Sequence, residues 1–295
     1  MAVVATGFFD GVHSGHRLVL DTLLARAAAR GEESVVVTFW PHPRVTLQKD
    51  AAAFRLLTSR SRRDAILRGL GVDRLETIDF SREFASLSAL DYIRMLRDGY
   101  GCTELVLGYD TRFGSEQAGP EAIAQMARAE GIDSVITPAV CAPDSSQPIS
   151  STLIRTALEA GDAALAGELL GRPYALEGVV VSGNRLGRTI GFPTANMAIS
   201  EPLMLIPCGG VYQSRVSVRG IEYDGMTNVG VRPTIGGSDA LVVETHIFGF
   251  DEMIYGENVS VSFVDRIRDE RRFPSLDALR AQLKADALQV LGEDF

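Results

Sequence analysis

Two histidines, His13 and His16, lie three residues apart in the glycine-rich run GFFDGVHSGH at residues 7–16. The run follows a short β-branched segment and precedes a helical pattern, which places it at a strand-to-helix turn. Glycine lets backbone approach a ligand closely, and a helix N-terminus offers unpaired N–H groups and positive partial charge. Each imidazole adds a further donor. The run is therefore predicted to bind phosphate.

The alternative interpretation of this run is a glycine-rich turn with incidental histidines. It is disfavoured because two of the chain's four histidines fall in the turn. A zinc site is disfavoured because no cysteine or third histidine lies nearby in sequence. The only lysines, Lys49 and Lys284, lie outside any glycine-rich segment, so a Walker-type loop is absent. Phosphate chemistry would have to use histidine, arginine, backbone amides and metal.

A second group of phosphate-compatible residues lies in ISSTLIR at residues 149–155. Ser151 and Arg155 are four residues apart and would share one face of a helix. The arginine guanidinium presents forked donors that match phosphate oxygens. An ordinary serine N-cap followed by a surface arginine is the alternative interpretation.

The C-terminal half carries a polar loop, GNRLGRTIGFPTAN, at residues 183–196. Its polar groups are Arg188, Thr189, Thr194 and Asn196. Thr194 and Asn196 point the same way if the segment is extended, and their oxygens suit Mg²⁺ and phosphate. A β-turn rich in glycine and proline is the alternative interpretation.

One carboxylate, Glu244, lies within the apolar run LVVETHI at residues 241–247. A carboxylate in such a run must be solvated, paired or facing a site. It could act as a general base toward an alcohol, which is barely acidic by itself. The alternative is a solvent-facing strand position, since Val242, Glu244 and His246 alternate on one side.

The elements that must position these residues change in kind along the chain. Strand patterns at residues 3–6, 35–39, 75–78, 105–107 and 134–137 alternate with helical patterns at 18–30, 61–70, 88–97 and 120–130. This alternation predicts a parallel sheet with ligands at the carboxyl ends of its strands. From residue 178 onward, short strands between turn residues predict a small barrel, closed by a helix that begins at Ser275. Residues 161–173 are the predicted junction.

The motifs of the first half resemble a known family. Residues 7–16 resemble the G-x-F-D-G-V-H-x-G-H form of the FMN adenylyltransferase domain of bacterial FAD synthetases, which belong to the H-x-G-H nucleotidyltransferases. Residues 149–155 resemble that family's I-S-S-T-x-x-R, and residues 38–43 its T-F-x-P-H-P. Residues 108–114 resemble G-x-[DN]-F-x-F-G, but Thr111 stands where the family has an aromatic residue. Residues 115–119 lack the basic residues commonly found there.

The second half resembles the riboflavin kinases. Residues 187–196 match their G-R-x-x-G-F-P-T-A-N, and the blocks at 210–212, 228–234, 243–248, 255–256 and 268–270 are also similar. The whole chain thus resembles the bifunctional riboflavin kinase/FMN adenylyltransferases. The resemblance implies a Rossmann-like α/β nucleotidyltransferase domain at residues 1–165 and an all-β riboflavin-kinase barrel with a terminal helix at 172–295.

The resemblance also implies the reactions and the site residues. Riboflavin would be phosphorylated by ATP, and the FMN phosphate would attack the ATP α-phosphorus and expel pyrophosphate, with Mg²⁺ as cofactor. The implied catalytic residues are His13, His16, Arg155 and Glu244. The implied ATP or phosphate contacts are Gly7, Phe9, Asp10, Gly15, Ser150, Ser151, Thr152, Gly183, Arg188, Gly191, Thr194 and Asn196. The implied flavin contacts are Trp40, Pro41, His42, Pro43, Asp110 and Arg268, and the implied metal contacts are Thr194 and Asn196.

Composition excludes several other classes. A net charge of −9 and a pI near 5.1 disfavour nucleic acid or an anionic membrane as partner. The arginines of residues 60–68, at helical spacing, are interpreted as a solvated helix face. Three cysteines far apart indicate neither a disulfide framework nor a zinc site. With no signal or membrane segment in the sequence, a cytoplasmic enzyme is expected, without an obligate protein partner.

Three further functions remain as alternatives at this stage. The chain could be a riboflavin kinase whose N-terminal domain binds nucleotide or flavin without adenylylating it. It could be a flavin carrier that binds without turnover. It could also transfer a nucleotidyl group to another acceptor, because the fold alone does not choose one.

Overall fold

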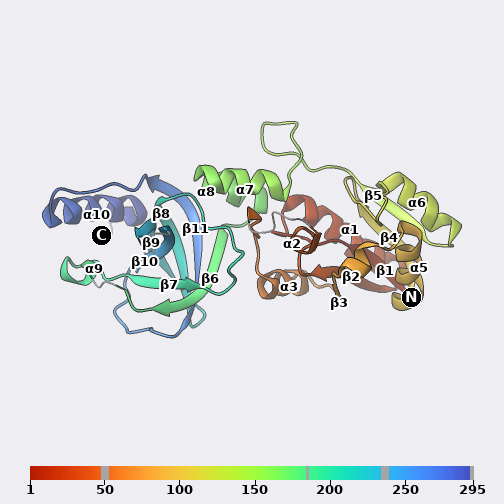
Figure 1. Cartoon of the computed structure of the whole chain (residues 1–295), viewed down its shortest axis with the longest axis horizontal. Helices are drawn as coiled ribbons and strands as arrows, with labels where there is room; N and C mark the ends of the chain where they lie inside the picture. The colour runs from red at the N-terminus through yellow and green to blue at the C-terminus, as the bar shows by residue number, and fades with distance from the viewer. Residues whose placement is uncertain (48–52, 184–185, 234–238, 293–295) are drawn as a thin grey trace. The chain divides into compact units, whose positions relative to one another are not determined.

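The structure, a computed structural model, describes residues 1–47, 53–183, 186–233 and 239–292 (Figure 1). It divides into two compact units, Met1–Ser151 and Thr152–Phe295. Asn184, Arg185 and Thr234, which belong to the quoted motifs, lie outside the described residues. No helix in the described ranges has both the length and the apolar character that a membrane span requires.

The first unit alternates strands and helices. Its strands are β1 (Ala2–Thr6), β2 (Glu33–Trp40), β3 (Arg74–Asp79), β4 (Cys102–Gly108) and β5 (Asp133–Thr137). Its helices are α1 (Ser14–Arg30), α2 (Pro43–Leu47), α3 (Arg60–Gly69), α4 (Arg82–Ala85), α5 (Ala89–Tyr100) and α6 (Pro120–Ala129). The strands pair in parallel in the order β3-β2-β1-β4-β5. The predicted Rossmann-like parallel sheet is confirmed.

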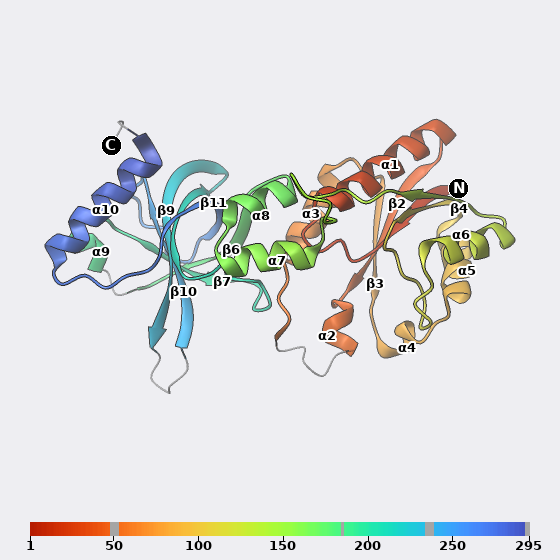
Figure 2. The ribbon, with the colours of Figure 1, turned by 90° about the horizontal axis from the view of Figure 1, so that it is seen from above.

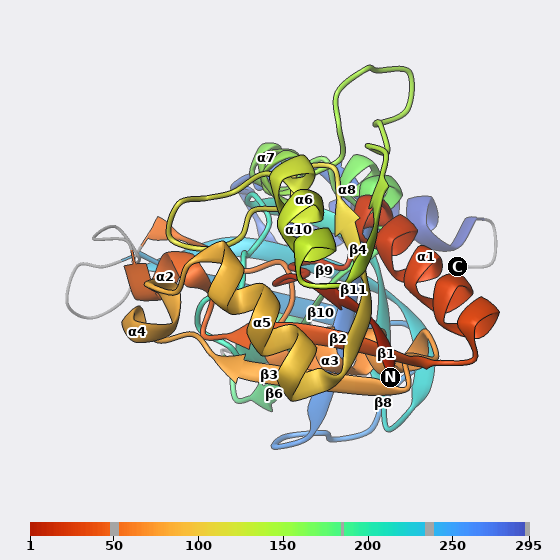
Figure 3. The same cartoon turned by 90° about the vertical axis from the view of Figure 1, so that its right-hand side faces the viewer.

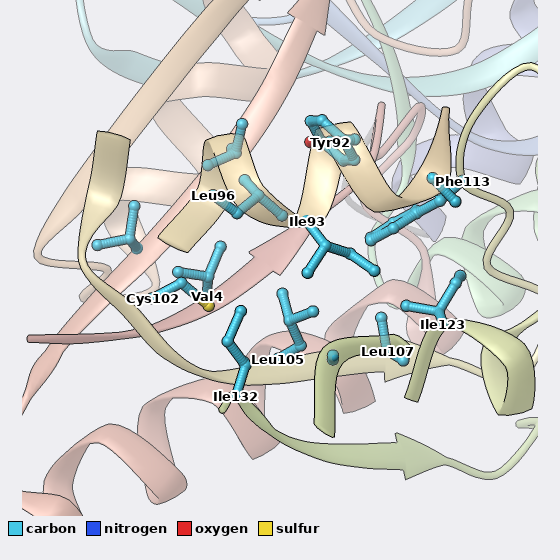
Figure 4. Close-up of a cluster of buried hydrophobic side chains, with 14 of the residues drawn as sticks. Val4, Tyr92, Ile93, Leu96, Cys102, Leu105, Leu107, Phe113, Ile123 and Ile132 are labelled. Atoms are coloured by element: carbon cyan, nitrogen blue, oxygen red, sulfur yellow. The ribbon is translucent and has the colours of Figure 1, made fainter. Parts of the chain in front are cut away.

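Successive strand residues point to opposite faces of the sheet, and apolar side chains on both faces pack against helices. Val4 and Leu105 face one way and pack with Ile93 of α5 and Ile123 of α6 (Figure 4). Their strand neighbours Val3, Ala5 and Val106 face the other way, toward Leu20 and Leu23 of α1. Figure 3 shows α5 and α6 on one side of the sheet and α1 on the other. Two cores therefore hold the strand ends rigidly.

The second unit begins at Thr152, in the first turn of α7 (Ser151–Ala160), which is followed by α8 (Ala163–Leu170). Its strands are β6 (Tyr174–Val181), β7 (Ala195–Ile199), β8 (Gly210–Val218), β9 (Ile221–Pro233), β10 (Asp239–Ile247) and β11 (Asn258–Arg268), with the short helix α9 (Leu186–Thr189) before β7. They form a closed antiparallel barrel in the order β10-β7-β6-β11-β8-β9 (Figure 1). The predicted all-β barrel is confirmed.

The predicted junction at residues 161–173 contains α8, which packs against β6 and β11 of the barrel. The domain boundaries at 165 and 172 stay a prediction. The compact units themselves divide between Ser151 and Thr152.

The terminal helix α10 (Leu276–Leu291) begins as predicted. Ser275 is its N-cap, and the serine hydroxyl accepts a hydrogen bond from the N–H of Ala278 at 3.1 Å. The helix packs against β9 (Figure 2). Its inner face is tied to β11 by Asp286, which is 2% exposed and is paired with Arg268 at 2.8 Å.

The interpretation of residues 60–68 as a solvated face is wrong at one position. Arg60 and Arg68 of α3 are exposed, but Arg63 is only 1% exposed. The helical spacing of these arginines does not distinguish the buried side chain from the exposed ones. Arg63 is buried because Asp64 and two backbone carbonyls satisfy its guanidinium.

Candidate active sites

The turn between β1 and α1 has a constrained backbone. Phe9, Gly11 and Val12 have positive φ angles of 57°, 82° and 41°. A β-branched residue rarely adopts this conformation, and strained backbone of this kind clusters at functional sites. Phe9 and Val12 pack into the core beneath α1. The packing of Phe9 and Val12 therefore fixes the backbone conformation of the turn.

The two histidines of this turn interact directly. His13 is the N-cap of α1, and its Nδ1 accepts a hydrogen bond from the N–H of His16 at 3.3 Å. In a neutral ring this leaves Nε2 of His13 to carry the proton. The two rings stack with centroids 3.6 Å apart, and Phe9 lies edge-on to His16 at 5.3 Å.

His16 has the strongest sign of a missing partner. Its Nδ1 is buried and has no hydrogen-bond partner among the described residues. Burial first, and the neighbouring His13 second, hold the pKa of His16 well below its usual value. A buried nitrogen without a partner costs free energy unless a ligand satisfies it. His16 is thus a neutral imidazole with capacity for a ligand.

Asp10, predicted to contact phosphate, accepts hydrogen bonds from the backbone of a segment distant in sequence. Its carboxylate is 3% exposed and accepts from the N–H groups of Leu57 at 3.0 Å and Thr58 at 3.2 Å. Thr58 Oγ1 in turn accepts from the N–H of Gly11 at 3.1 Å. The hydroxyl of Ser151 donates to the Asp10 carbonyl at 2.9 Å. These bonds fasten the turn to the segment before α3 and to the start of α7.

A cavity of about 480 Å³ opens at the carboxyl ends of the parallel strands. Strand order reverses between β1 and β4, which is where α/β sheets bind ligands. The cavity is lined in part by predicted site residues: Gly7, Phe9, His13, Gly15, His16, Pro43 and Asp110. Segments more than ninety residues apart in sequence thus meet in one cavity of a size that suits a small molecule.

Three predicted flavin contacts lie beside this lining. Trp40 and Pro41 are joined by a cis peptide bond. Their neighbour His42 packs edge-on to Phe8 at 4.1 Å and against Phe54 at 4.3 Å. Phe8 itself lines the cavity, and the rings of Trp40 and His42 contact the Phe8 ring.

Sequence reasoning missed several residues of the lining. Thr6 and Tyr92 share a short hydrogen bond of 2.5 Å between their hydroxyls, and both line the cavity. Burial raises the pKa of Tyr92, which therefore stays protonated. Arg44 and Arg112 also line the cavity and are the arginines of its lining within the described residues. Tyr92 lies in a predicted helix, but nothing in its spacing indicates that it reaches a strand end.

The stretch after Gly114 has a structural role. Glu116 accepts a hydrogen bond from the N–H of Ala89 at 2.8 Å, at the first residue of α5. Phe113 pairs with Ala118 across the same loop. The missing basic residues are thus replaced by a segment that caps α5, while Arg112 lines the cavity. Thr111 lines the cavity where an aromatic residue was expected.

Three further predicted residues lie at the start of α7. Ser150 precedes the helix, and Thr152 lies in its first turn. Arg155 follows Ser151 by one helical turn, as the spacing predicts, and belongs to the second compact unit.

The second unit contains a separate cavity of about 280 Å³. Of the predicted residues, Arg188 and Thr194 line it. Thr245 of β10 and residues 250–255 complete much of the wall. Gly191, another predicted phosphate contact, has φ of 86°, so the turn itself needs a glycine there.

Glu244 lies on the outer side of the barrel. Its neighbours in β10, Val243 and Thr245, are buried, whereas Glu244 is half-buried. In the antiparallel register Glu244 is opposite Asn196 of β7 on one side and Asn228 of β9 on the other. Directly opposed residues share one face of a sheet. The predicted base is therefore flanked by two carboxamides, one of them the predicted metal contact.

The loop residue Gly183 is held against this group. A Cβ at Gly183 would lie 2.5 Å from Cγ of Asn196 and overlap its carboxamide. The side chain of Asn196 is 5% exposed, so it has little room to move aside. Glycine at this position thus lets the loop approach Asn196.

His246 supports the loop that leads to Thr194. Its Nδ1 donates to the carbonyl of Pro193 at 2.7 Å, and its ring packs edge-on to Phe192 and Phe248. Burial lowers the pKa of His246. The ring therefore serves as a neutral brace between β10 and the segment before β7.

Arg268, a predicted flavin contact, is engaged by protein. Its guanidinium donates to both carboxylate oxygens of Asp286, at 2.8 to 3.0 Å, and to the carbonyl of Asp269 at 3.0 Å. Its side chain is 16% exposed. Through these contacts Arg268 anchors α10 to β11.

Comparison with known proteins agrees with this division. Residues 1–153 match the FAD synthetase family and residues 170–291 match the riboflavin kinase family. The chain is 37% identical to the bifunctional riboflavin kinase/FMN adenylyltransferase of Pseudomonas fluorescens, over 96% of this chain and 90% of that protein. It is 38% identical to the protein of the same name from Escherichia coli strain K12, over 97% and 90%.

A solved structure from Streptococcus pneumoniae is also similar over the full length. It is named a macrolide-efflux protein, is 35% identical, and superposes with a TM-score of 0.89 over 99% of this chain and 94% of its own. Two family matches and near-complete relatives lead to one assignment. The chain belongs to the bifunctional riboflavin kinase/FMN adenylyltransferase family.

Proposed function

We propose that this chain phosphorylates riboflavin to FMN with ATP in the barrel unit, and adenylylates FMN to FAD in the α/β unit. One observation carries the proposal: each compact unit has its own cavity, lined by residues of the motif that its family match implies. The relatives from Pseudomonas fluorescens and Escherichia coli are named for both activities.

In the adenylyl transfer, the FMN phosphate attacks the ATP α-phosphorus and pyrophosphate leaves. No covalent protein intermediate is needed, so catalysis depends on positioning and on neutralising charge. His16 donates to a phosphate oxygen through the nitrogen that lacks a protein partner. His13 donates through Nε2, and a contact of Arg155 with phosphate stays a prediction from the sequence. The aromatic side of the cavity, with Phe39, Phe84 and Tyr92, suits the flavin ring.

In the kinase reaction, Glu244 accepts the proton of the ribityl hydroxyl as that oxygen attacks the γ-phosphorus of ATP and ADP leaves. The flanking carboxamides of Asn196 and Asn228 hold the carboxylate and substrate in register. Arg188 and Thr194, which line the barrel cavity, contact the ATP phosphates.

Mg²⁺ is the metal proposed for both reactions. In the described ranges, no cluster of three or more His, Cys, Asp or Glu side chains could hold a metal ion. Thr194 and Asn196 offer oxygen ligands, Asn196 lies opposite Glu244 in the strand register, and this donor set fits a hard cation. Mg²⁺ commonly takes few protein ligands together with substrate phosphates. When bound, it would neutralise phosphate charge.

The alternative of a kinase with a silent N-terminal domain predicts FMN without FAD. Against it, the cavity of the α/β unit retains both histidines and has Arg112 in its lining. Riboflavin, FMN and ATP are the proposed ligands, and a cytoplasmic location without an obligate protein partner stays a prediction.

The test is to incubate the purified protein with riboflavin, ATP and Mg²⁺ and to separate the flavins by chromatography over time. FMN followed by FAD is expected, and EDTA should prevent both. FMN alone would remove adenylylation from the proposal. Binding of riboflavin without any product would replace the proposal with the carrier alternative.

A further inference from the structure

Arg63 is a buried cation directly behind the cavity of the α/β unit. It is the largest of the side chains that are almost fully buried, at 1% exposure. Its Nε and Nη2 donate to Oδ1 of Asp64 at 3.1 and 2.9 Å. Burying an arginine is costly unless its charge and donors are satisfied, so its remaining contacts are informative.

The third nitrogen of Arg63 joins two strand ends. Nη1 donates to the carbonyl of Phe39, near the end of β2, at 3.1 Å, and to the carbonyl of Phe8, just after β1, at 3.3 Å. Phe8 and Phe39 both line the cavity, whereas Arg63 does not. One guanidinium thus fixes two adjacent wall segments without reaching the ligand space.

The same guanidinium also orders the aromatic side chains of that wall. Its Cζ lies 4.8 Å from the ring centre of Phe8 and 5.9 Å from that of Trp40. The Phe8 and Trp40 rings stack at 6.2 Å. Cation–π contact with a desolvated arginine adds to the hydrogen bonds in holding these rings.

We infer that Arg63 is a positioning residue for adenylyl transfer, which sets the wall at Phe8 and Phe39 against which the FMN substrate is bound. This inference rests on the proposed function of the α/β unit. Arg63 acts through the carbonyls of Phe8 and Phe39 and through the rings beside them. This wall would contact FMN equally in the substrate complex and in the transition state. Its loss should therefore appear mainly in KM for FMN and less in kcat.

The experiment compares three variants of the full-length protein. Arg63→Met keeps an unbranched side chain that can stay buried but removes the charge and the donors. Arg63→Lys keeps the charge, but an ammonium cannot reproduce the forked contacts. Arg68→Met is the matched control, because Arg68 lies on the same helix and is exposed.

Arg63→Met is expected to raise KM for FMN in FAD formation by about tenfold or more, consistent with loss of hydrogen bonds from a charged group. Arg63→Lys should recover part of that loss, and Arg68→Met should match wild type. Riboflavin phosphorylation by the same samples should be unchanged. Trp40 is the only tryptophan, so the emission of the unliganded protein should change in Arg63→Met and not in Arg68→Met.

Two results would overturn the inference. One is a KM for FMN in Arg63→Met that lies within about twofold of the wild-type KM, where a rise of about tenfold is expected. The other is a loss of kcat alone, with KM and Trp40 emission unchanged. If Arg63→Met does not fold, an unchanged KM in folded Arg63→Lys overturns it equally. Absence of FAD formation by wild type would instead refute the proposed function, which keeps the two failures distinct.

Discussion

The imidazole rings of His13 and His16 stack with centroids 3.6 Å apart and an interplanar angle of 19°. Two protonated rings could not occupy this arrangement at low cost, because like charges at this distance repel strongly. The N-cap bond from His16 N–H to His13 Nδ1 fixes the pair. The site therefore presents at most one imidazolium near neutral pH.

The stability of the α/β unit should depend on pH through His16. Its pKa in the folded state is well below normal, mainly because of burial and secondly because of His13. In the unfolded chain it is about 6.5. Between these two pKa values only the unfolded state binds the proton. The free energy of unfolding therefore falls as pH falls below about 6.5, by up to about 1.4 kcal/mol per pH unit.

This dependence can be measured by urea unfolding followed by Trp40 fluorescence, which reports on the first unit. His16→Gln should lose less stability than wild type between about pH 7 and pH 5, in the window where the histidine titrates. Arg68→Met, at an exposed position of α3 in the same unit, is the control and should retain the wild-type slope. Equal slopes for wild type and His16→Gln would contradict the role of His16.

The two activities should be separable by single substitutions. Glu244→Gln removes the proposed base and should lower FMN formation by about 10²-fold or more, while FAD formation from supplied FMN continues. His16→Ala should have the reverse effect. Both activities are measured by chromatographic separation of the flavins that each folded variant produces. Loss of both activities in either variant would show that the two-site division is wrong.

Much of the fold was predictable because the chain's local patterns agree with its tertiary structure. The alternation of β-branched runs with helical patterns predicted the parallel sheet, and Ser275 predicted the start of α10. The two histidines were found from their glycines and their place between β1 and α1. These signals lie within a few residues of one another, which is the range at which sequence patterns are informative.

The remaining features depend on contacts between distant segments. The pairing of Thr6 with Tyr92 spans 86 residues, and the bonds of Asp10 to Leu57 and Thr58 span 47 and 48. No spacing rule predicts such contacts. Asp10 lies in the motif that predicts a phosphate contact, but the motif does not indicate its bonds to the backbone amides of Leu57 and Thr58. Arg63 has the same helical spacing as its exposed neighbours, and the carbonyls that it binds lie on distant segments.

Gly183 offers a test of the Asn196 carboxamide. Gly183→Ala would place a methyl group 2.5 Å from Cγ of Asn196 and displace it. The KM for ATP in FMN formation should rise about tenfold, if one charge-assisted contact of the carboxamide is lost. FAD formation from FMN should be unaffected. Gly209→Ala is the matched control, because its methyl group would meet only the carbonyl of Val229 at an ordinary 3.5 Å.

Wild-type KM in Gly183→Ala would mean that the Asn196 side chain does not contact ATP or its metal. An equal rise in Gly209→Ala would mean that the barrel responds to any added methyl group. The first result would remove Asn196 from the proposed metal contacts, and the second would show that the rise in Gly183→Ala does not report on Asn196.

The Arg268–Asp286 pair should stabilise the terminal helix. Asp286 is 2% exposed and accepts from Arg268 and from Nε2 of Gln282, the latter at 2.7 Å. Asp286→Ala leaves a largely buried guanidinium unpaired, which should cost about 3–5 kcal/mol. Asp277→Ala is the control on the same helix, because its pair with Arg280 is exposed and should contribute about 1 kcal/mol or less.

Hydrogen exchange of the α10 amides is the appropriate measurement, because Trp40 lies in the other unit. Asp286→Ala should accelerate exchange throughout α10, whereas Asp277→Ala should affect only its first turn. Arg268→Met combined with Asp286→Leu should restore much of the protection, because an apolar pair can replace a buried ion pair without leaving a charge unpaired. If the double variant protects α10 but forms no FMN, Arg268 has a role in the kinase site beyond anchoring the helix. If it forms FMN at the wild-type rate, the predicted flavin contact of Arg268 is wrong.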